Sequence, residues 1–331
     1  MNWLHKLLLK FRPYHLLVEW SKVMIIPGFS PLPIYTVATF FFQEIGKDSL
    51  INKASSLAYN FMLAIFPAII FLFTLIPYIP INNFQDQLMT LISLVLPTNA
   101  YLAVETTLED IVKNQNSKLL SFGFVFALFF ATNGVHNLMQ AFNRSSLLIE
   151  SRSFIKQRLV ALYLTILIAF ALISGLTIIT IGEYLFNFLK SEIRFKDSFW
   201  LLILTTVRWT ILLCIYFVTI SILYRYGPAH AKKWRFFSAG SWLATILAIL
   251  TFGGFSFYIN NFGNYNKIYG SIGTLIVMMI WLYLNSLIIL VGFELNASID
   301  LSKRSIKIVK PRFNSFRRPE PQENLQKKKV N

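Results

Sequence analysis

Six long apolar stretches restrict what this chain can fold into more than any other feature. A helix needs about 20 mostly apolar residues to cross the hydrocarbon core of a bilayer. Because backbone exposed to lipid must satisfy its own hydrogen bonds, continuous apolar runs of this length predict helices and not open sheets or short barrel strands. We therefore expect an all-α polytopic membrane protein, a bundle of six transmembrane helices. The predicted spans are approximately residues 57–79, 119–141, 159–181, 200–224, 236–259 and 272–293.

Composition excludes an ordinary soluble enzyme. Of the 331 residues, 55% are hydrophobic and only 14% are charged, whereas soluble domains carry about 25% charged residues. The single cysteine, Cys214, excludes a disulfide framework or a cysteine-based zinc site within one chain.

The basic residues predict the orientation of the spans. Of the 31 Lys and Arg residues, 24 lie in the N-terminal segment, the second-to-third loop, the fourth-to-fifth loop and the tail. The alternate loops hold six, and Arg208 lies inside a span. Because cytoplasmic loops accumulate Lys and Arg, both termini are predicted to be cytoplasmic.

Three regions are predicted. Residues 1–50 form a cytoplasmic and interfacial segment, since residues 1–20 are amphipathic without a signal-peptide pattern and the apolar stretch 25–42 contains three prolines. Residues 51–300 form the transmembrane domain, and residues 301–331 form a basic, disordered tail. The tail has two open interpretations: it contacts anionic lipid headgroups at the cytoplasmic face, or it only enforces topology and solubility.

The long loop 80–117 between the first two spans is acidic and contains an apolar run too short to cross a membrane. Pro97 and Thr98 are typical of a helix start, with Thr98 as the N-cap. We expect one or two short helices at the outer surface.

The second span carries polar side chains on one helical face. Asn133, His136, Asn137, Gln140 and Arg144 are spaced three, four, seven and eleven residues from the first. Such a face avoids lipid. It is either the wall of a cytoplasm-facing cavity or a surface that holds helices together by hydrogen bonds.

Other intramembrane polar groups lie at similar depths. At about 1.5 Å per residue, Asn133 and Asn285 each lie roughly 20 Å from the outer ends of their helices. Asn60 and Glu294 lie toward the same inner side, so a polar inner vestibule is the simplest common explanation. The substrate-path candidates are Asn60, Asn133, His136, Asn137, Gln140, Arg208, Asn285 and Glu294.

Arg208 is the basic residue buried within a span, and three interpretations stay open. Its long side chain reaches the outer interface, or it pairs with Glu183, or it provides a fixed positive charge for an anionic headgroup.

The fifth span carries small residues at four-residue spacing, namely Gly240, Ala244 and Ala248, followed by Gly253 and Gly254. Stripes of this kind allow helices to approach closely, so this helix is predicted to pack centrally or at a dimer contact. A hinge is the alternative for the glycine pair.

Several local strings resemble the YihY/BrkB family of inner-membrane proteins, in order over roughly residues 50–300. They are KASSLAYN (53–60), IFP (65–67), AFNR (141–144), RSFIKQR (152–158), NFGNYNKIYGSIG (261–273) and GFELNA (292–297). One departure is Ser145-Ser146, where the family usually has an aromatic residue. The resemblance implies a six-helix protein of the bacterial inner membrane with cytoplasmic termini. It implies no settled activity, because members have been named both for a ribonuclease and for a virulence factor, and some are proposed to export lipids or lipopolysaccharide.

The residues argue against a nuclease and against any enzyme. Metal-assisted phosphodiester hydrolysis needs converging carboxylates or histidines, whereas this chain has four histidines without an HxH or HxxxH pair. A phosphate-binding P-loop is absent from the sequence. We therefore predict no cofactor, no metal and no nucleic-acid partner.

The loop before the sixth span is rich in Asn, Gly and Tyr. It either binds a polar headgroup at the outer face or forms a tight hairpin loop, in which Asn and Gly adopt positive φ angles. Its candidate residues are Asn261, Asn264, Tyr265 and Tyr269.

The leading functional hypothesis is a secondary transporter or flippase-like exporter of an anionic amphiphile, such as a lipid or lipopolysaccharide precursor. A non-catalytic scaffold for envelope assembly is the alternative, and a membrane-bound ribonuclease ranks last. Membrane lipids are the expected partners, and a homo-oligomer is possible.

Overall fold

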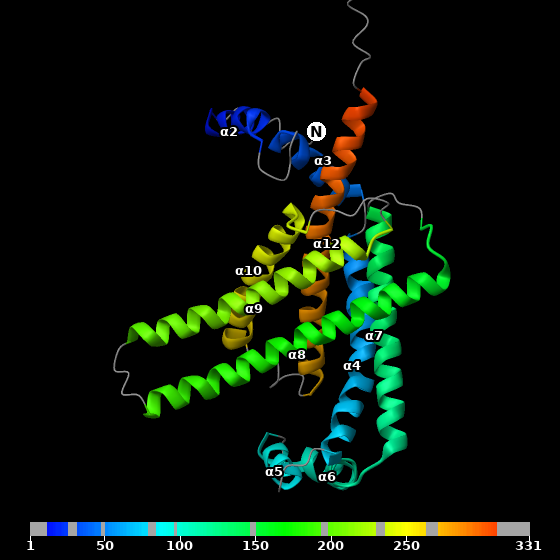
Figure 1. Cartoon of the computed structure of the whole chain (residues 1–331), viewed down its shortest axis with the longest axis vertical. Helices are drawn as coiled ribbons and strands as arrows, with labels where there is room; N and C mark the ends of the chain where they lie inside the picture. The colour runs from blue at the N-terminus through cyan, green and yellow to red at the C-terminus, as the bar shows by residue number, and fades with distance from the viewer. Residues whose placement is uncertain are drawn as a thin grey trace, which may run out of the picture. The chain divides into compact units, whose positions relative to one another are not determined.

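The computed structural model describes residues 12–25, 32–47, 50–78, 84–95, 98–145, 150–192, 198–229, 236–262 and 271–309. Within these ranges the regular structure is helical, without strands, which confirms the all-α prediction (Figure 1). The helices are α2 (Arg12–Val23), α3 (Ile34–Lys47), α4 (Leu50–Leu75), η1 (Ile76–Tyr78), α5 (Phe84–Val95), α6 (Thr98–Lys113), α7 (Ser117–Ser145), α8 (Phe154–Glu192), α9 (Ser198–Tyr226), α10 (Ala239–Phe262) and α12 (Ser271–Val309).

All six predicted spans are present. The described residues contain six helices long and apolar enough to cross a membrane, one in each predicted stretch. The helices extend beyond the apolar runs, because hydropathy detects the lipid-embedded part while the helix continues into polar ends. Thus α4 begins at Leu50, and α12 continues to Val309.

The chain divides into two compact units. One comprises residues 1–43 and 297–331, and the other comprises residues 44–296. The second unit contains five complete spans and most of the sixth. Residues 301–309, which were predicted to begin the disordered tail, are helical instead and form the last turns of α12. Residues 310–331 of that tail and residues 1–11 of the predicted amphipathic segment lie outside the described residues.

Helices α4 and α7 run antiparallel and pack together along much of their length (Figure 1). Glycines on α7 allow this approach. A Cβ atom added at Gly123 would lie 3.0 Å from the backbone nitrogen of Phe71, and one added at Gly134 would lie 3.0 Å from the ring of Phe61. Larger residues there would separate the two helices.

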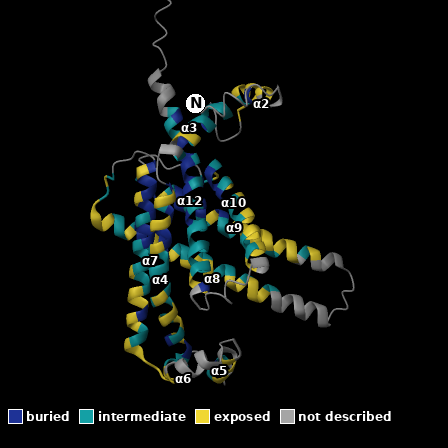
Figure 2. Cartoon of the chain, turned by 180° about the vertical axis from the view of Figure 1, so that it is seen from behind, coloured by how far each residue is buried: buried dark blue, intermediate teal, exposed yellow. Residues whose placement is uncertain are grey.

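Helices α8 and α9 lie side by side, and α8 crosses α4 and α7 obliquely (Figure 1). Much of their surface is exposed and apolar (Figure 2). In α8, for example, Phe170, Ile173 and Leu176 are each more than 60% exposed. Side chains of this kind are expected to face lipid.

An aromatic cluster joins α7, α9 and α12. The rings of Phe142 and Phe293 stack with their centroids 4.0 Å apart, and Tyr224 meets both rings edge-on. The Tyr224 hydroxyl donates to the Ile289 carbonyl oxygen at 2.7 Å. Because all three rings are almost fully buried, this cluster is a core contact of the second unit.

The small-residue prediction for the fifth span is confirmed in its first half. A Cβ atom added at Gly240 would lie 2.0 Å from the carbonyl oxygen of Gly292 on α12, and Ala244 is fully buried. Gly253 and Gly254 do not pack centrally, because no described atom lies within 4 Å of an added Cβ and both residues are exposed. For this pair the dimer contact and the hinge stay predictions.

The predicted outer-loop helices are α5 and α6, and α6 begins at Thr98 as expected. They pack on η1 through a small apolar cluster that includes Ile76, Met89 and Val112. Lys113 pairs with Asp86 and Glu109.

Helix α2 has the character predicted for an interfacial helix. Leu16, Leu17, Trp20 and Val23 are each more than half exposed. Lys22 pairs with Glu19, and this pair raises the pKa of the lysine and lowers that of the glutamate.

Candidate functional site

The predicted polar face of α7 contacts both α4 and α8. Nδ2 of Asn133 donates to Oδ1 of Asn60 at 3.3 Å, and Nη1 of Arg158 on α8 donates to Oδ1 of Asn133 at 3.2 Å. Asn60 in turn donates to the carbonyl oxygen of Ser56 at 2.7 Å. This chain of bonds satisfies polar groups that would otherwise lie unpaired beside lipid.

His136 lies one turn further along α7 and is only 7% exposed. Its Nε2 lies 3.1 Å from Nε2 of Gln140. An amide nitrogen can only donate, so the imidazole Nε2 accepts in this arrangement and a neutral ring carries its hydrogen on Nδ1. That Nδ1 has no hydrogen-bond partner among the described residues.

Beside Gln140, the N-terminal half of α4 and the C-terminal half of α7 line a polar cavity of about 350 Å³. We call it the α4–α7 cavity. The lining residues are Asn52, Lys53, Ser56, Leu57, Asn137, Gln140, Ala141 and Arg144. The cavity therefore holds two predicted path residues, Asn137 and Gln140, and its described lining has two cations and no acid.

Three lining groups have no partner among the described residues. Across that part of the chain, the side chains of Asn52, Asn137 and Arg144 make no hydrogen bond or ion pair. Lys53, in contrast, is engaged, and one of its contacts is a long bond of 3.4 Å to Oγ of Ser145. The cavity thus presents polar donors and positive charge.

A separate polar cluster, which we call the Glu150 cluster, joins the C-terminal ends of α7 and α9 to the segment before α8. Arg152 makes two charged hydrogen bonds of 2.7 Å to the Glu150 carboxylate and a third bond, of 3.0 Å, to the Gly227 carbonyl oxygen. Buried Asn143 donates to Glu150 and accepts from the backbone of Ala229, both at 2.7 Å. Hydrogen bonding to Arg152 holds the pKa of Glu150 below its ordinary value, against the opposing effect of burial.

Sequence reasoning missed part of this arrangement. Lys53, Arg152 and Arg158 were counted only as charges that set the orientation, and Asn52 and Ser56 were not singled out. A signal did exist, because residues 52, 53 and 56 fall on one helical face. The single acid within the basic second-to-third loop, Glu150, was a second signal.

Two predicted path residues, Asn285 and Glu294, lie elsewhere, on α12. Asn285 donates to the Trp281 carbonyl oxygen of its own helix at 2.8 Å, so this bond does not link it to Asn133. Glu294 is 1% exposed and follows Phe293 of the aromatic cluster. Neither residue lines the α4–α7 cavity.

Arg208 belongs to the α8–α9 contact. A Cβ atom added at Gly182 of α8 would lie 2.9 Å from Cδ of Arg208, and the buried Nε of Arg208 has no hydrogen-bond partner in the described ranges. The side chain of Glu183, its predicted ion-pair partner, is outside the description.

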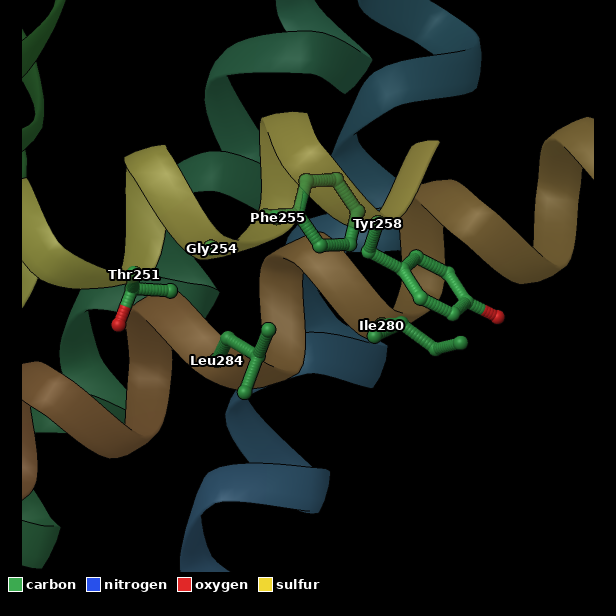
Figure 3. A pocket seen from close by; sticks show the side chains of 6 residues that line it. All are labelled: Thr251, Gly254, Phe255, Tyr258, Ile280 and Leu284. Carbon is green, nitrogen blue, oxygen red and sulfur yellow. The ribbon is translucent and has the colours of Figure 1, made fainter. Parts of the chain in front are cut away.

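The outer-loop candidates are not tested by the structure. Asn261 lies in the last turn of α10, but its side chain is not described, and Asn264, Tyr265 and Tyr269 lie outside the described residues. The C-terminal half of α10 instead borders an apolar groove of about 330 Å³. Phe255 and Tyr258 of α10 and Ile280 and Leu284 of α12 line it (Figure 3). Such a lining suits lipid chains better than a polar ligand.

Metal ligands do not gather in the part of the chain that was described. No group of three or more His, Cys, Asp or Glu residues there lies close enough to hold a metal ion.

Comparison with known proteins gives one family. Residues 41–312 match the family described as Virulence factor BrkB. The chain is 34% identical over 253 residues to YfkH of Bacillus subtilis, whose name describes it as ribonuclease-like, with 76% of this chain and 91% of that protein covered.

More distant relatives are named only as membrane proteins. A UPF0761 membrane protein of Xanthomonas campestris is 27% identical over 263 residues, and one of Xanthomonas euvesicatoria is 26% identical over 263 residues. The aligned region covers 79% of this chain but only 60% of each of these relatives. No solved structure matches the chain.

Proposed function

The chain belongs to the Virulence factor BrkB family of membrane proteins, and from that premise we propose that it is a secondary transporter or flippase-like exporter of an anionic amphiphile. The α4–α7 cavity is the observation that supports this proposal most directly. It is polar, it lies between two spans, and its described lining carries Lys53 and Arg144 without an acid.

The depth of the cavity fits a path that starts at one membrane surface. Arg144 and Gln140 are exposed near the end of α7, whereas Asn137 is half-buried and lies further along the span. Beyond it, Asn133 and Asn60 continue the polar face between the same two helices. An amphiphile could place its headgroup against these residues while its chains stay in lipid.

The same proposal includes the membrane and the orientation. We place the protein in the bacterial inner membrane with both termini in the cytoplasm, because 24 of the 31 basic residues lie on the side of the termini. The α4–α7 cavity then opens toward the cytoplasm. Reporter fusions after Val309 and within loop 79–83 should be active on opposite sides of the membrane.

A lipid-movement assay tests the transport proposal. Purified protein is placed in vesicles that contain dye-labelled anionic or zwitterionic lipid, and an impermeant quencher reports lipid that reaches the outer leaflet. We expect faster quenching of anionic lipid than in protein-free vesicles. Asn137→Leu should abolish the difference, because it replaces a polar cavity wall with an apolar one.

Thr177→Val is the matched control. It also replaces a polar side chain within a span, but Thr177 donates to the Ile173 carbonyl oxygen of its own helix at 2.8 Å and does not line the cavity. Quenching by wild-type vesicles at the protein-free rate would contradict lipid transport and favour the scaffold alternative.

A further inference from the structure

We propose that His136 is a proton-binding site and that Gln140 transmits its proton state to the α4–α7 cavity, so that the cavity binds an anionic headgroup more tightly when His136 carries a proton. This inference rests on the proposed function, because it assigns a regulation to the same cavity.

His136 differs from its polar neighbours on α7 because one of its ring nitrogens is unused. Asn133 and Asn143 each donate through the amide nitrogen and accept through the amide oxygen. His136 bonds to Gln140 through Nε2, whereas its Nδ1 has no partner among the described residues although the side chain is buried. A buried polar group without a partner is destabilising, so a purely structural role does not explain this histidine. Imidazole is the side chain that gains or loses a proton near neutral pH.

The hydrogen bond to Gln140 needs a different arrangement for each proton state. In the structure, Nε2 of Gln140 lies 3.1 Å from Nε2 of His136 and donates to it, so the ring nitrogen uses its lone pair. A protonated ring carries hydrogen on both nitrogens and accepts nothing. Two N–H groups would then face each other, so the amide of Gln140 has to rotate and present its oxygen to the ring.

This rotation changes what the cavity offers a ligand. Gln140 lines the cavity and is exposed. A neutral His136 occupies the amide nitrogen and leaves the amide oxygen, an acceptor, for the cavity. A protonated His136 occupies the oxygen and leaves the N–H groups, which are donors that suit the oxygens of an anionic headgroup. Proton and headgroup therefore strengthen each other's binding by the same factor.

The charges near the ring come mainly from α8 and the segment before it. Arg158, Arg152 and Glu150 are close enough for their charges to act on His136. Arg152 and Glu150 pair with each other, whereas Arg158 makes no ion pair within the described ranges. An anionic headgroup in the cavity would weaken the repulsion between Arg158 and a protonated ring.

Three further elements pack on α7. From α4, Lys53 lines the cavity and is engaged by other groups. Helices α9 and α12 meet α7 through the aromatic cluster, in which the Tyr224 hydroxyl bonds a carbonyl oxygen and which buried Glu294 follows. Because the ring bonds to Gln140 and to no other described residue, this amide is its connection to the cavity.

Nuclear magnetic resonance of the full-length protein in detergent tests proton binding directly. His5, His15 and His230 are replaced by Gln, so that the ring ¹⁵N shifts of His136 report its tautomer and its protonation. We expect the ring to gain a proton between about pH 8 and about pH 5.5, and the side-chain amide of Gln140 to shift with the same midpoint. A ring that stays neutral over this range, or that titrates without a change at Gln140, would overturn the inference.

The pH dependence of lipid movement tests the response of the cavity. The vesicle assay uses a low fraction of dye-labelled phosphatidylglycerol, whose charge is constant over this range, with protein-free vesicles at each pH as the reference. We expect movement to be at least about fivefold faster near pH 5.5 than near pH 8, the lower end of the usual coupling between two sites. His136→Gln should remove this dependence, because glutamine takes up no proton.

Gln140→Met covers the case in which His136→Gln fails to fold. It keeps the ring but removes the amide, so His136 should still titrate while lipid movement loses its pH dependence. His15→Gln is the matched control, because it removes an exposed histidine of α2, and it should keep the wild-type dependence. Retention of the dependence in Gln140→Met, or its loss in His15→Gln, would contradict the assigned connection.

The two measurements separate this inference from transport. If His136 and Gln140 titrate together but the protein moves no lipid at either pH, transport alone is refuted. If lipid moves equally fast at both pH values, this inference alone is refuted.

Discussion

Nη1 of Arg158, in the second turn of α8, donates to Oδ1 of Asn133 on α7 at 3.2 Å. The same Asn133 donates to Asn60 on α4, so one amide joins three helices. The guanidinium also lies over the ring of Phe154, 5.4 Å from its centroid. Arg158 therefore fixes α8 against the α4–α7 pair.

Replacing this arginine should destabilise the protein. We expect Arg158→Gln to lower the free energy of unfolding by about 1–3 kcal/mol, the usual cost of removing a charged hydrogen bond from a partly buried partner. Thermal unfolding in detergent measures the change. Lys156→Gln removes a charge two residues earlier without such a bond, and an equal loss in this control would contradict the assigned role of Arg158.

The contact between α10 and α12 predicts that a glycine-to-alanine substitution has opposite effects on stability at Gly240 and at Gly254. A Cβ atom at Gly240 would lie 2.0 Å from the Gly292 carbonyl oxygen and 2.7 Å from Cγ of Asn296. Gly240→Ala should therefore force the helices apart and cost at least about 1–3 kcal/mol. Gly254→Ala meets no described atom within 4 Å and should be neutral or stabilising by up to about 1 kcal/mol. Similar melting temperatures for the two variants would contradict this helix contact.

The hydrogen bonds that Glu150 makes to Asn143 and Arg152 connect α7, α8 and α9. We expect this connection to weaken in acid. The pKa of Glu150 is lower in the folded protein than its ordinary value of 4.5. Its stabilising contribution is therefore complete above the unfolded pKa and is lost as the pH falls through the folded pKa. The amides of Arg152 and Ala229 bond to Glu150 and Asn143. Their protection factors, which correct hydrogen exchange for the slower intrinsic rate in acid, should fall as the pH drops below 4.5.

Glu150→Gln provides the control for this pH dependence. At pH 7 these amides should have lower protection factors in the variant than in wild type, and the further fall of protection in acid should be absent. If the variant keeps that fall, a different acid is responsible.

Metal removal tests the ribonuclease-like name of the Bacillus relative. Because the described residues contain no group of three potential metal ligands, we expect EDTA to leave the melting temperature unchanged. We also expect purified protein to leave RNA intact with or without Mg²⁺. EDTA-sensitive RNA cleavage that persists through further purification would contradict the prediction.

Sequence alone was sufficient for much of the architecture. The six spans could be predicted from local apolar content, because the free energy of transferring a helix into lipid depends on that segment's own side chains and backbone hydrogen bonds. The polar face of α7 follows from helical periodicity, and Asn133, His136 and Gln140 do lie where that period places them. The helix rise per residue places Asn285 at the depth of Asn133, but it did not predict the hydrogen bond that Asn285 makes. A polar side chain in a helix can bond a carbonyl oxygen of its own preceding turn instead of a neighbouring helix.

Only the tertiary structure decided which groups the polar face meets. Asn60 and Asn133 are 73 residues apart, and their contact depends on the register in which α4 and α7 pack around Gly123 and Gly134. That register also places Lys53 opposite Asn137 and Arg144, and so forms the cavity. Hydropathy and periodicity describe each helix by itself, whereas the partners of a polar face depend on side-chain packing between helices that are distant in the chain.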